Sequence, residues 1–139
     1  MSHIAIARWG AVLAGLAVVF GAYGAHGLES LLSQWGFGEE LAQRLEWFET
    51  GVRYQFPHAL ALLLIGWAGN PHSRLQRIAA AAFLLGTLLF SGSLYGLTLL
   101  DASWRKLGAI TPLGGLALIV GWALLAIDPR GQMPPEKQA

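Results

Sequence analysis

His26 and His58 are the side chains of this sequence with the widest range of possible chemistry within apolar stretches. Imidazoles that met at one depth of a membrane protein could ligate a metal ion or relay a proton. A zinc site needs three or four ligands, and the nearby carboxylates, Glu29 and Glu49, fall at the surface, so we expect neither a metal nor a cofactor. More often, such residues join helices by hydrogen bonds. We therefore expect His26 and His58 to approach each other in a cluster whose role is structural.

Four apolar stretches must position these residues, and they cover residues 9–28, 51–68, 78–100 and 107–127. Each is about 18 to 23 residues long, which suits a hydrocarbon core roughly 30 Å thick. If the stretches cross a bilayer in alternating directions, nearly all of their hydrogen-bonding side chains lie in one half of the bundle. The candidate polar cluster consists of Tyr23, His26, Tyr54, Gln55, His58, Ser91, Ser93, Tyr95 and Thr111.

Composition places the chain among integral membrane proteins. It has 139 residues, of which 55% are hydrophobic and 12% charged, whereas soluble domains are about one quarter charged. The length predicts a single membrane domain over 1–127, followed by a polar tail over 128–139. A formal net charge of +1 offers no footprint for nucleic acid, and without cysteine there is neither a disulfide nor a thiolate nucleophile.

The first apolar stretch has two interpretations. Arg8, the apolar run and the small residues near its end also fit a cleaved signal peptide. A face of small residues favours a retained span instead, because such faces let helix backbones approach closely in membranes. This face consists of Gly10, Ala14, Ala17, Gly21 and Ala25.

Between the first two stretches the pattern becomes amphipathic. Over residues 39–56, Leu41, Leu45 and Phe48 recur at helical spacing. On the opposite face, Glu40 and Glu49 are placed to pair with Arg44 and Arg53. This predicts an amphipathic helix between spans 1 and 2, either on the membrane surface or solvated and packed over the bundle end. Pro57 then follows, and we expect a kinked second span that runs from about residue 51, with a freed backbone carbonyl that His58, Gln55 or a water would satisfy.

Tryptophan placement supports four spans with both termini on one side. Trp9, Trp67 and Trp122 fall near one interface, and the other three tryptophans fall near the opposite one, as aromatic belts require. Lys and Arg side chains slightly favour the side of the termini, which predicts that both termini are cytoplasmic. The two sets are Arg8, Arg74, Arg77, Arg130 and Lys137 against Arg44, Arg53, Arg105 and Lys106.

Four ordered strings carry a resemblance to a known family. They are GAYGAHGL at 21–28, FETGVRYQFPHALALLL at 48–64, LFSGSLYGL at 89–97 and LGAITPLGGLALIVGW at 107–122. The chain resembles the bacterial membrane proteins of domain-of-unknown-function 423, which are related to eukaryotic transmembrane protein 256. The resemblance implies a small four-span inner-membrane protein and brings no activity or catalytic residue with it. Pro57 departs from the large non-proline residue expected there.

The function expected from the sequence is that of a small inner-membrane protein without catalytic residues. No nucleophile with a base, phosphate loop or metal motif is found, so we do not expect an enzyme. The main hypothesis is a structural or accessory module with membrane lipids as partners, in a homo-oligomer or a larger membrane complex. The alternative is binding or transport of a small ligand, lipid, proton or ion at the polar half of the bundle.

Overall fold

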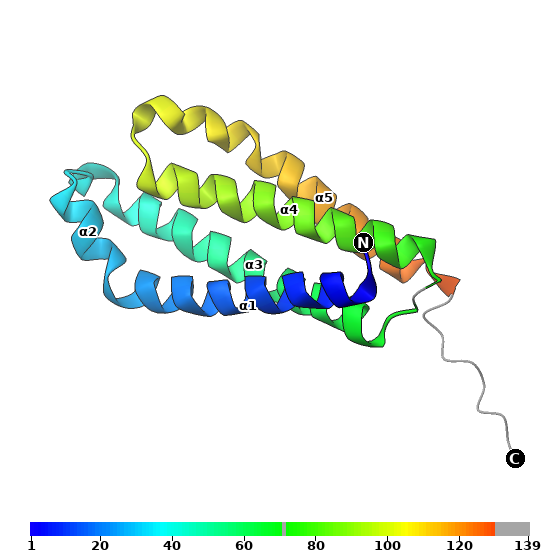
Figure 1. Cartoon of the computed structure of the whole chain (residues 1–139). Coiled ribbons are helices and arrows are strands. Elements are labelled where there is room, and N and C mark those ends of the chain that lie inside the picture. Colours follow the sequence, from blue (N-terminus) through cyan, green and yellow to red (C-terminus); the bar gives the residue numbers. More distant parts are fainter. Residues whose placement is uncertain (71, 130–139) are drawn as a thin grey trace, which may run out of the picture.

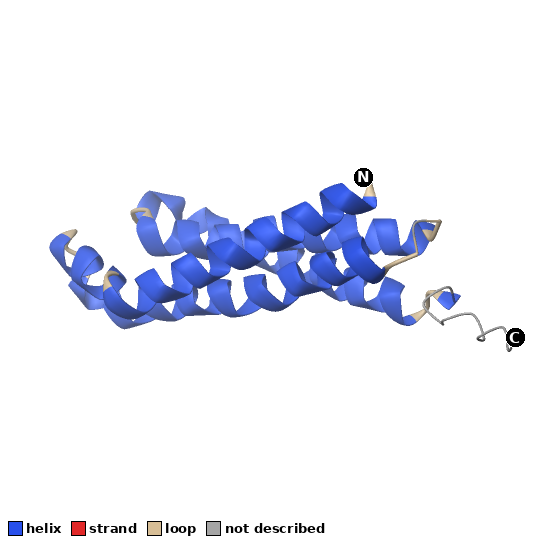
Figure 2. Cartoon of the chain, turned by 60° about the horizontal axis from the view of Figure 1, so that its bottom comes forward, coloured by secondary structure: helices blue, strands red, loops and turns tan. Residues whose placement is uncertain are grey.

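The computed structural model describes residues 1–70 and 72–129, and its regular secondary structure is entirely helical over these residues (Figure 2). The elements are α1 (His3–His26), α2 (Leu28–Gln34), η1 (Gly38–Glu40), α3 (Leu41–Ala68), α4 (Arg74–Leu99), η2 (Ala102–Ala109) and α5 (Thr111–Ala126), where η denotes a 3₁₀ helix. The predicted all-α class is confirmed. The predicted polar tail lies almost entirely outside the described residues.

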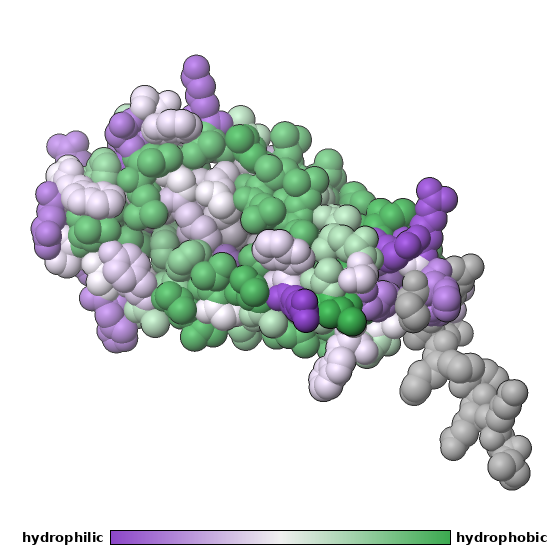
Figure 3. Space-filling view, in the orientation of Figure 1, coloured by the Kyte–Doolittle hydropathy of each residue, from purple (hydrophilic) through white to green (hydrophobic). Residues whose placement is uncertain are grey.

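The long helices pack in chain order, α1 against α3, α3 against α4 and α4 against α5. They form one elongated bundle (Figure 1). The start of α1 and the end of α5 lie at the same end, whereas α2, η1 and η2 gather at the opposite end, here called the η2 end (Figure 1). Both ends are hydrophilic and the middle is largely apolar (Figure 3).

Within the described ranges, three segments are long and apolar enough to cross a membrane on their own, and they are His3–His26, Arg74–Leu99 and Ala102–Ala126. Long apolar side chains point outward from them, for example Val18 on α1 at 62% exposure and Ile119 on α5 at 66%. In water such surfaces would be costly, whereas a bilayer covers them. The long helix α3 does not meet the same apolar criterion.

Helix α3 corrects the predicted boundary between a surface helix and the second span. It runs for 28 residues without a break and includes Pro57. The separate amphipathic helix over 39–56 is therefore wrong, and so is a second helix that begins near residue 51. The charged face over Glu49 and Arg53 belongs to the first half of the same helix, where both side chains are exposed. At 1.5 Å per residue, α3 is about 42 Å long, longer than a hydrocarbon core of about 30 Å.

The short helix between α1 and α3 is α2 instead. Leu28 and Leu32 are fully buried and pack with Phe48 of α3, while Glu29 and Ser33 face outward. Helix α2, seven residues long, therefore buries one face and covers the η2 end of the α1–α3 pair.

The small residues of α1 are only partly buried. Gly10 meets α3 so closely that an added Cβ would lie 2.6 Å from the Leu63 backbone nitrogen. Ala17 is buried as well, whereas Ala25 is exposed. The predicted packing face is thus confirmed over its first half, whereas toward the η2 end it is exposed at Ala25.

Candidate functional site

A buried amide joins three helices near the middle of the bundle. Gln55 of α3 is 3% exposed. Its Nε2 donates to the Leu13 carbonyl of α1 over 2.8 Å, and its Oε1 accepts a hydrogen bond from the Tyr95 hydroxyl of α4 over 2.9 Å. Tyr95 reaches this position because its ring lies over Gly51, where a Cβ would come within 2.7 Å of the ring. The interaction satisfies both ends of the amide inside the protein.

Hydroxyl groups on α4 make the next helix-to-helix bonds. Ser91 donates to the Gly51 carbonyl of α3 over 2.8 Å. Ser93 bonds Thr111 at the start of α5 over 2.7 Å. These serines and Thr111 were predicted as members of the polar cluster, and the structure uses them to tie α4 to both of its neighbours.

His58 lies among aromatic rings between α3 and α5. Its Nδ1 is 2.6 Å from the Tyr54 carbonyl, and its Nε2 accepts a hydrogen bond from the Trp122 indole over 3.0 Å. This arrangement requires a neutral imidazole with its proton on Nδ1. Both ring nitrogens are thereby engaged, which leaves no lone pair for a metal. The carbonyl that His58 contacts is that of Tyr54, not the one that Pro57 leaves free.

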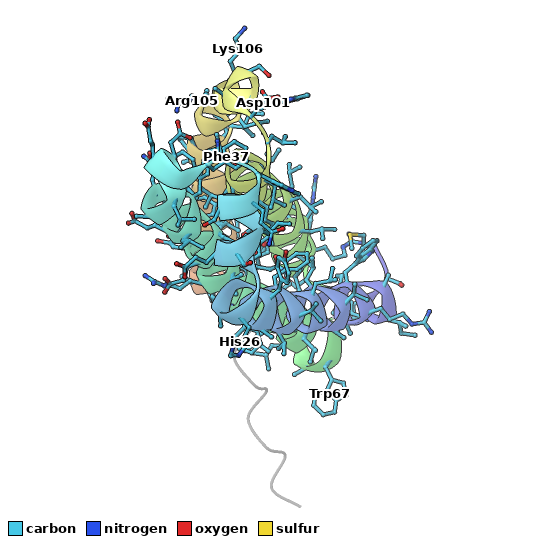
Figure 4. The ribbon with its side chains drawn as sticks, turned by 90° about the vertical axis from the view of Figure 1, so that its left-hand side faces the viewer. His26, Phe37, Trp67, Asp101, Arg105 and Lys106 are labelled. Atoms are coloured by element: carbon cyan, nitrogen blue, oxygen red, sulfur yellow. The ribbon has the colours of Figure 1, made fainter. Side chains whose placement is uncertain are left out.

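His26 and Tyr23 do not join these residues. His26 is exposed at the end of α1, and in Figure 4 it points away from the body of the bundle. Gly24 of α1, two residues before His26, packs on Phe48 of α3. Along the axis of α3, Phe48 and His58 are about 15 Å apart. The predicted approach of His26 and His58 is therefore wrong. Its physical reason is that α3 begins at Leu41, which moves His58 from the start of the helix to its middle.

Tyr54 lies at the edge of the cluster rather than inside it. It is 44% exposed, and its ring packs on Phe90 with centroids 4.6 Å apart. The predicted set is therefore divided into four groups. These are the bonded interior (Gln55, Tyr95, Ser91), the α4–α5 contact (Ser93, Thr111), the aromatic group (Tyr54, His58) and the two outward-facing residues (Tyr23, His26).

A buried cation, Arg44, was missed as a member of the polar interior. It is 2% exposed and covers the carboxyl end of α4. Its Nη1 lies 2.8 Å from the carbonyls of Thr98 and Leu100 and 3.1 Å from that of Leu97. Carbonyls at a helix end lack partners within the helix, and a cation there also suits the helix dipole. Arg44 thus closes α4.

The surroundings of Arg44 connect it to the rest of the η2 end. Its guanidinium lies 3.6 Å from the centroid of the Phe37 ring and 2.9 Å from the Glu40 carboxylate. Glu40 also pairs with Arg105 of η2. The predicted Glu40–Arg44 pair is confirmed, but it is half inside the protein rather than on a solvated face.

One buried hydroxyl has no partner among the residues that the structure describes, that of Thr87 on α4. The bonds from Ser91 to Gly51 and from Thr98 to Arg44 fix the antiparallel register of α3 and α4. In that register Thr87 stands opposite Gln55. A group of three or more His, Cys, Asp or Glu side chains that could hold a metal is not found among these residues either.

The polar side chains of the interior mainly bond one helix to another. Comparisons with known proteins identify the family of the chain. A family model described as "Protein of unknown function (DUF423)" matches residues 20–115. The chain belongs to the DUF423 family. A DUF423 relative, the UPF0382 membrane protein YwdK of Bacillus subtilis, is 40% identical over 120 residues, which cover 85% of this chain and 89% of YwdK.

Two further relatives of this DUF423 protein are similar over most of their length. A UPF0382 membrane protein of Haemophilus influenzae is 38% identical over 78% of this chain and 80% of its own. The UPF0382 inner membrane protein YgdD of Escherichia coli is 37% identical over 79% of this chain and 77% of its own. No solved structure matches. The family resemblance expected from the four strings is confirmed, and this DUF423 chain is a transmembrane protein of a family without an assigned activity.

Proposed function

We propose that the protein is a four-span module of the bacterial inner membrane that acts without catalysis, as a structural or accessory subunit. This proposal rests on the hydrogen bonds that the interior polar groups make between helices. Gln55, Ser91 and Tyr95 each bond a neighbouring helix. In hydrocarbon each would otherwise stand unsatisfied, so these groups serve the cohesion of the bundle.

Helix α3 is the fourth span in this proposal. It packs between α1 and α4, which bury several of its polar residues while its charged first half keeps one exposed face. Arg44, Gln55 and His58 are all buried and bonded. A helix enclosed in this way tolerates side chains that a lipid-facing span does not. Its modest apolar character thus reflects its central position.

The cations support one orientation of the bundle. Arg44 caps α4 inside the protein, so it does not count as a free loop charge at the η2 end. Arg74 and Arg77 are exposed at the opposite end, near the start of α4. Positive charge concentrates on the cytoplasmic side of bacterial membrane proteins. We therefore place both termini in the cytoplasm and the η2 end in the periplasm.

Native-lipid extraction tests the accessory role. The full-length protein is cross-linked in cells, extracted with its surrounding lipid by an amphipathic copolymer, and analysed by mass spectrometry. We expect a second copy or one recurring membrane protein at a fixed ratio. Recovery of single copies alone would contradict the proposal. Co-purification of one small molecule or ion in its place would favour the binding function.

A further inference from the structure

A groove lies over α4 at the η2 end, between α3 and η2. It has a volume of about 410 Å³. Its floor is apolar and consists of Leu94 and Leu97, and its walls carry Gln43 and Trp47 from α3 and Arg105 and Thr111 from the other side. Helix η2 packs on α4 and α5, and the Glu40–Arg105 pair joins it to the end of η1, directly before α3. The groove is thus apolar within and polar at its rim.

We propose that this groove binds one glycerophospholipid of the surrounding bilayer, with its phosphate at Arg105 and an acyl chain on Leu94 and Leu97. The proposal goes beyond the accessory role, because it assigns a specific ligand to a site outside the bonded interior. It also stands apart from the predicted polar cluster, since only Thr111 belongs to both.

The polar lining suits an anionic group. Of the described residues, none that lines the groove is a carboxylate, whereas Arg105, Gln43 and Trp47 are lining residues whose side chains carry N–H donors. Arg105 uses one terminal nitrogen toward Glu40, and a guanidinium has five N–H groups, so it keeps donors for a phosphate. Gln43 is exposed, and no hydrogen bond joins its amide or the Trp47 indole to another described residue.

The apolar part suits an acyl chain and depends on a glycine. Leu94 and Leu97 are 6% and 9% exposed, so they form a packed floor. A Cβ at Gly108 would meet only Leu97, at 3.9 Å. The missing side chain therefore leaves space over the floor, and a longer side chain there would fill the groove without disturbing a backbone.

The position of the groove matches the height of lipid phosphates. Trp47 lines it, and Trp104 is exposed on the adjacent 3₁₀ helix. Tryptophans of this kind lie at the level of lipid headgroups. Arg105 therefore stands where a phosphate would be, with the apolar floor directed toward the hydrocarbon.

The test uses the full-length protein, stripped of lipid in mild detergent and titrated with dioleoylphosphatidylglycerol under native mass spectrometry. We expect one lipid to bind more tightly than the rest. Gly108→Leu and Arg105→Gln should each weaken that site by about tenfold or more. Dioleoylglycerol, which lacks the phosphate, should bind the wild-type protein as weakly as phosphatidylglycerol binds the Arg105→Gln variant.

Two control variants match these changes. Lys106→Gln removes the same charge from the neighbouring residue, whose side chain points away from the bundle (Figure 4). Gly15→Leu adds the same side chain to an exposed face of α1 that has open space. Both should keep the tight site. Circular dichroism checks that each variant is folded, and Arg105→Gln still tests the site if Gly108→Leu does not fold.

The proposal fails if the controls lose the tight lipid as fully as the groove variants do, because binding is then annular. It fails as well if dioleoylglycerol equals phosphatidylglycerol. A change of oligomeric state in the groove variants, with lipid binding unaltered, would assign the groove to a second copy instead. Equal affinity for phosphatidylethanolamine, still dependent on Arg105, would support it with the shared phosphodiester as the determinant.

Discussion

At the scale of single residues, the buried amide of Gln55 shows how the interior is held. It contacts α1 through the Leu13 carbonyl and α4 through the Tyr95 hydroxyl. Lipid offers no replacement partner, so the loss of either contact leaves a polar group unsatisfied. The same reasoning applies to Ser91 and the Gly51 carbonyl.

A double-mutant cycle on Gln55→Leu and Tyr95→Phe measures this interaction. We expect a coupling free energy of about 0.6–1.7 kcal/mol, between the mean and the maximum found for hydrogen bonds between helices in membranes. Reversible unfolding in mixed detergent micelles gives the four free energies of unfolding. Strictly additive effects would show that the contact contributes nothing to stability.

The unpaired hydroxyl of Thr87 leads to the opposite expectation. Thr87→Val removes a buried group without a partner among the described residues and keeps the shape of the side chain. The free energy of unfolding should stay the same or rise, by up to about 1–3 kcal/mol. The same measurement on Ser91→Ala provides the contrast, because that variant loses a bond and should be destabilised. A destabilised Thr87→Val variant would indicate that the hydroxyl has a bound partner.

Much of the polar interior could be predicted from residue type and depth alone. Gln55, Ser91 and Tyr95 are polar side chains within apolar stretches, and such residues must find partners in the protein. Arg44 was missed because it follows Glu40 at a spacing that also fits an exposed pair. Its signal is a stripe of buried positions at helical spacing: Arg44, Phe48, Gly51, Gln55, His58, Leu62 and Ile65.

At the scale of elements, close backbone contacts set the packing of α1 on α3. Gly10→Ala would place a methyl group 2.6 Å from the Leu63 nitrogen, so the helices must separate. We expect a loss of about 1–3 kcal/mol in the free energy of unfolding. Gly15→Ala is the control, because that position is open and alanine favours helix, so it should be neutral or stabilising. Equal losses in both variants would mean that the contact is not where the structure has it.

The cap on α4 predicts a large difference between two arginines of the same helix. Arg44→Met removes the donor to three carbonyls and should cost about 1.5–3 kcal/mol of unfolding free energy. Arg53→Met breaks an exposed pair with Glu49 and should cost less than about 0.5 kcal/mol. Thermal unfolding in detergent compares the two variants. Similar losses would contradict a buried role for Arg44.

The boundaries of the elements were harder to predict than the all-helical class. Glu40, Glu49 and Arg53 look like a surface helix when taken without the fold, and Pro57 suggests an interruption. The structure continues the helix through both features, because the first half of α3 packs on α2 and η1 and its charged face stays outside. The packing of α2 and η1 on α3 decides between a separate surface helix and one continuous helix. No local sequence pattern reveals that packing.

At the scale of the whole molecule, the helices pack in the order α1, α3, α4 and α5, and the outer sides of α1 and α5 remain apolar and exposed. Lipid or a second copy of the chain would cover them. We propose that α3 completes the bundle as a fourth crossing, although in the described part of the chain the apolar character of a span is found in three other segments.

Cysteine accessibility tests that claim most directly, because the chain has no native cysteine. Ser33→Cys on α2 and His72→Cys between α3 and α4 place a probe at either end of α3. With a membrane-impermeant maleimide on intact spheroplasts, we expect Ser33→Cys to label at once and His72→Cys only after permeabilisation. Reversed labelling would overturn the cytoplasmic termini alone. Labelling of both positions from the same side would contradict the fourth span.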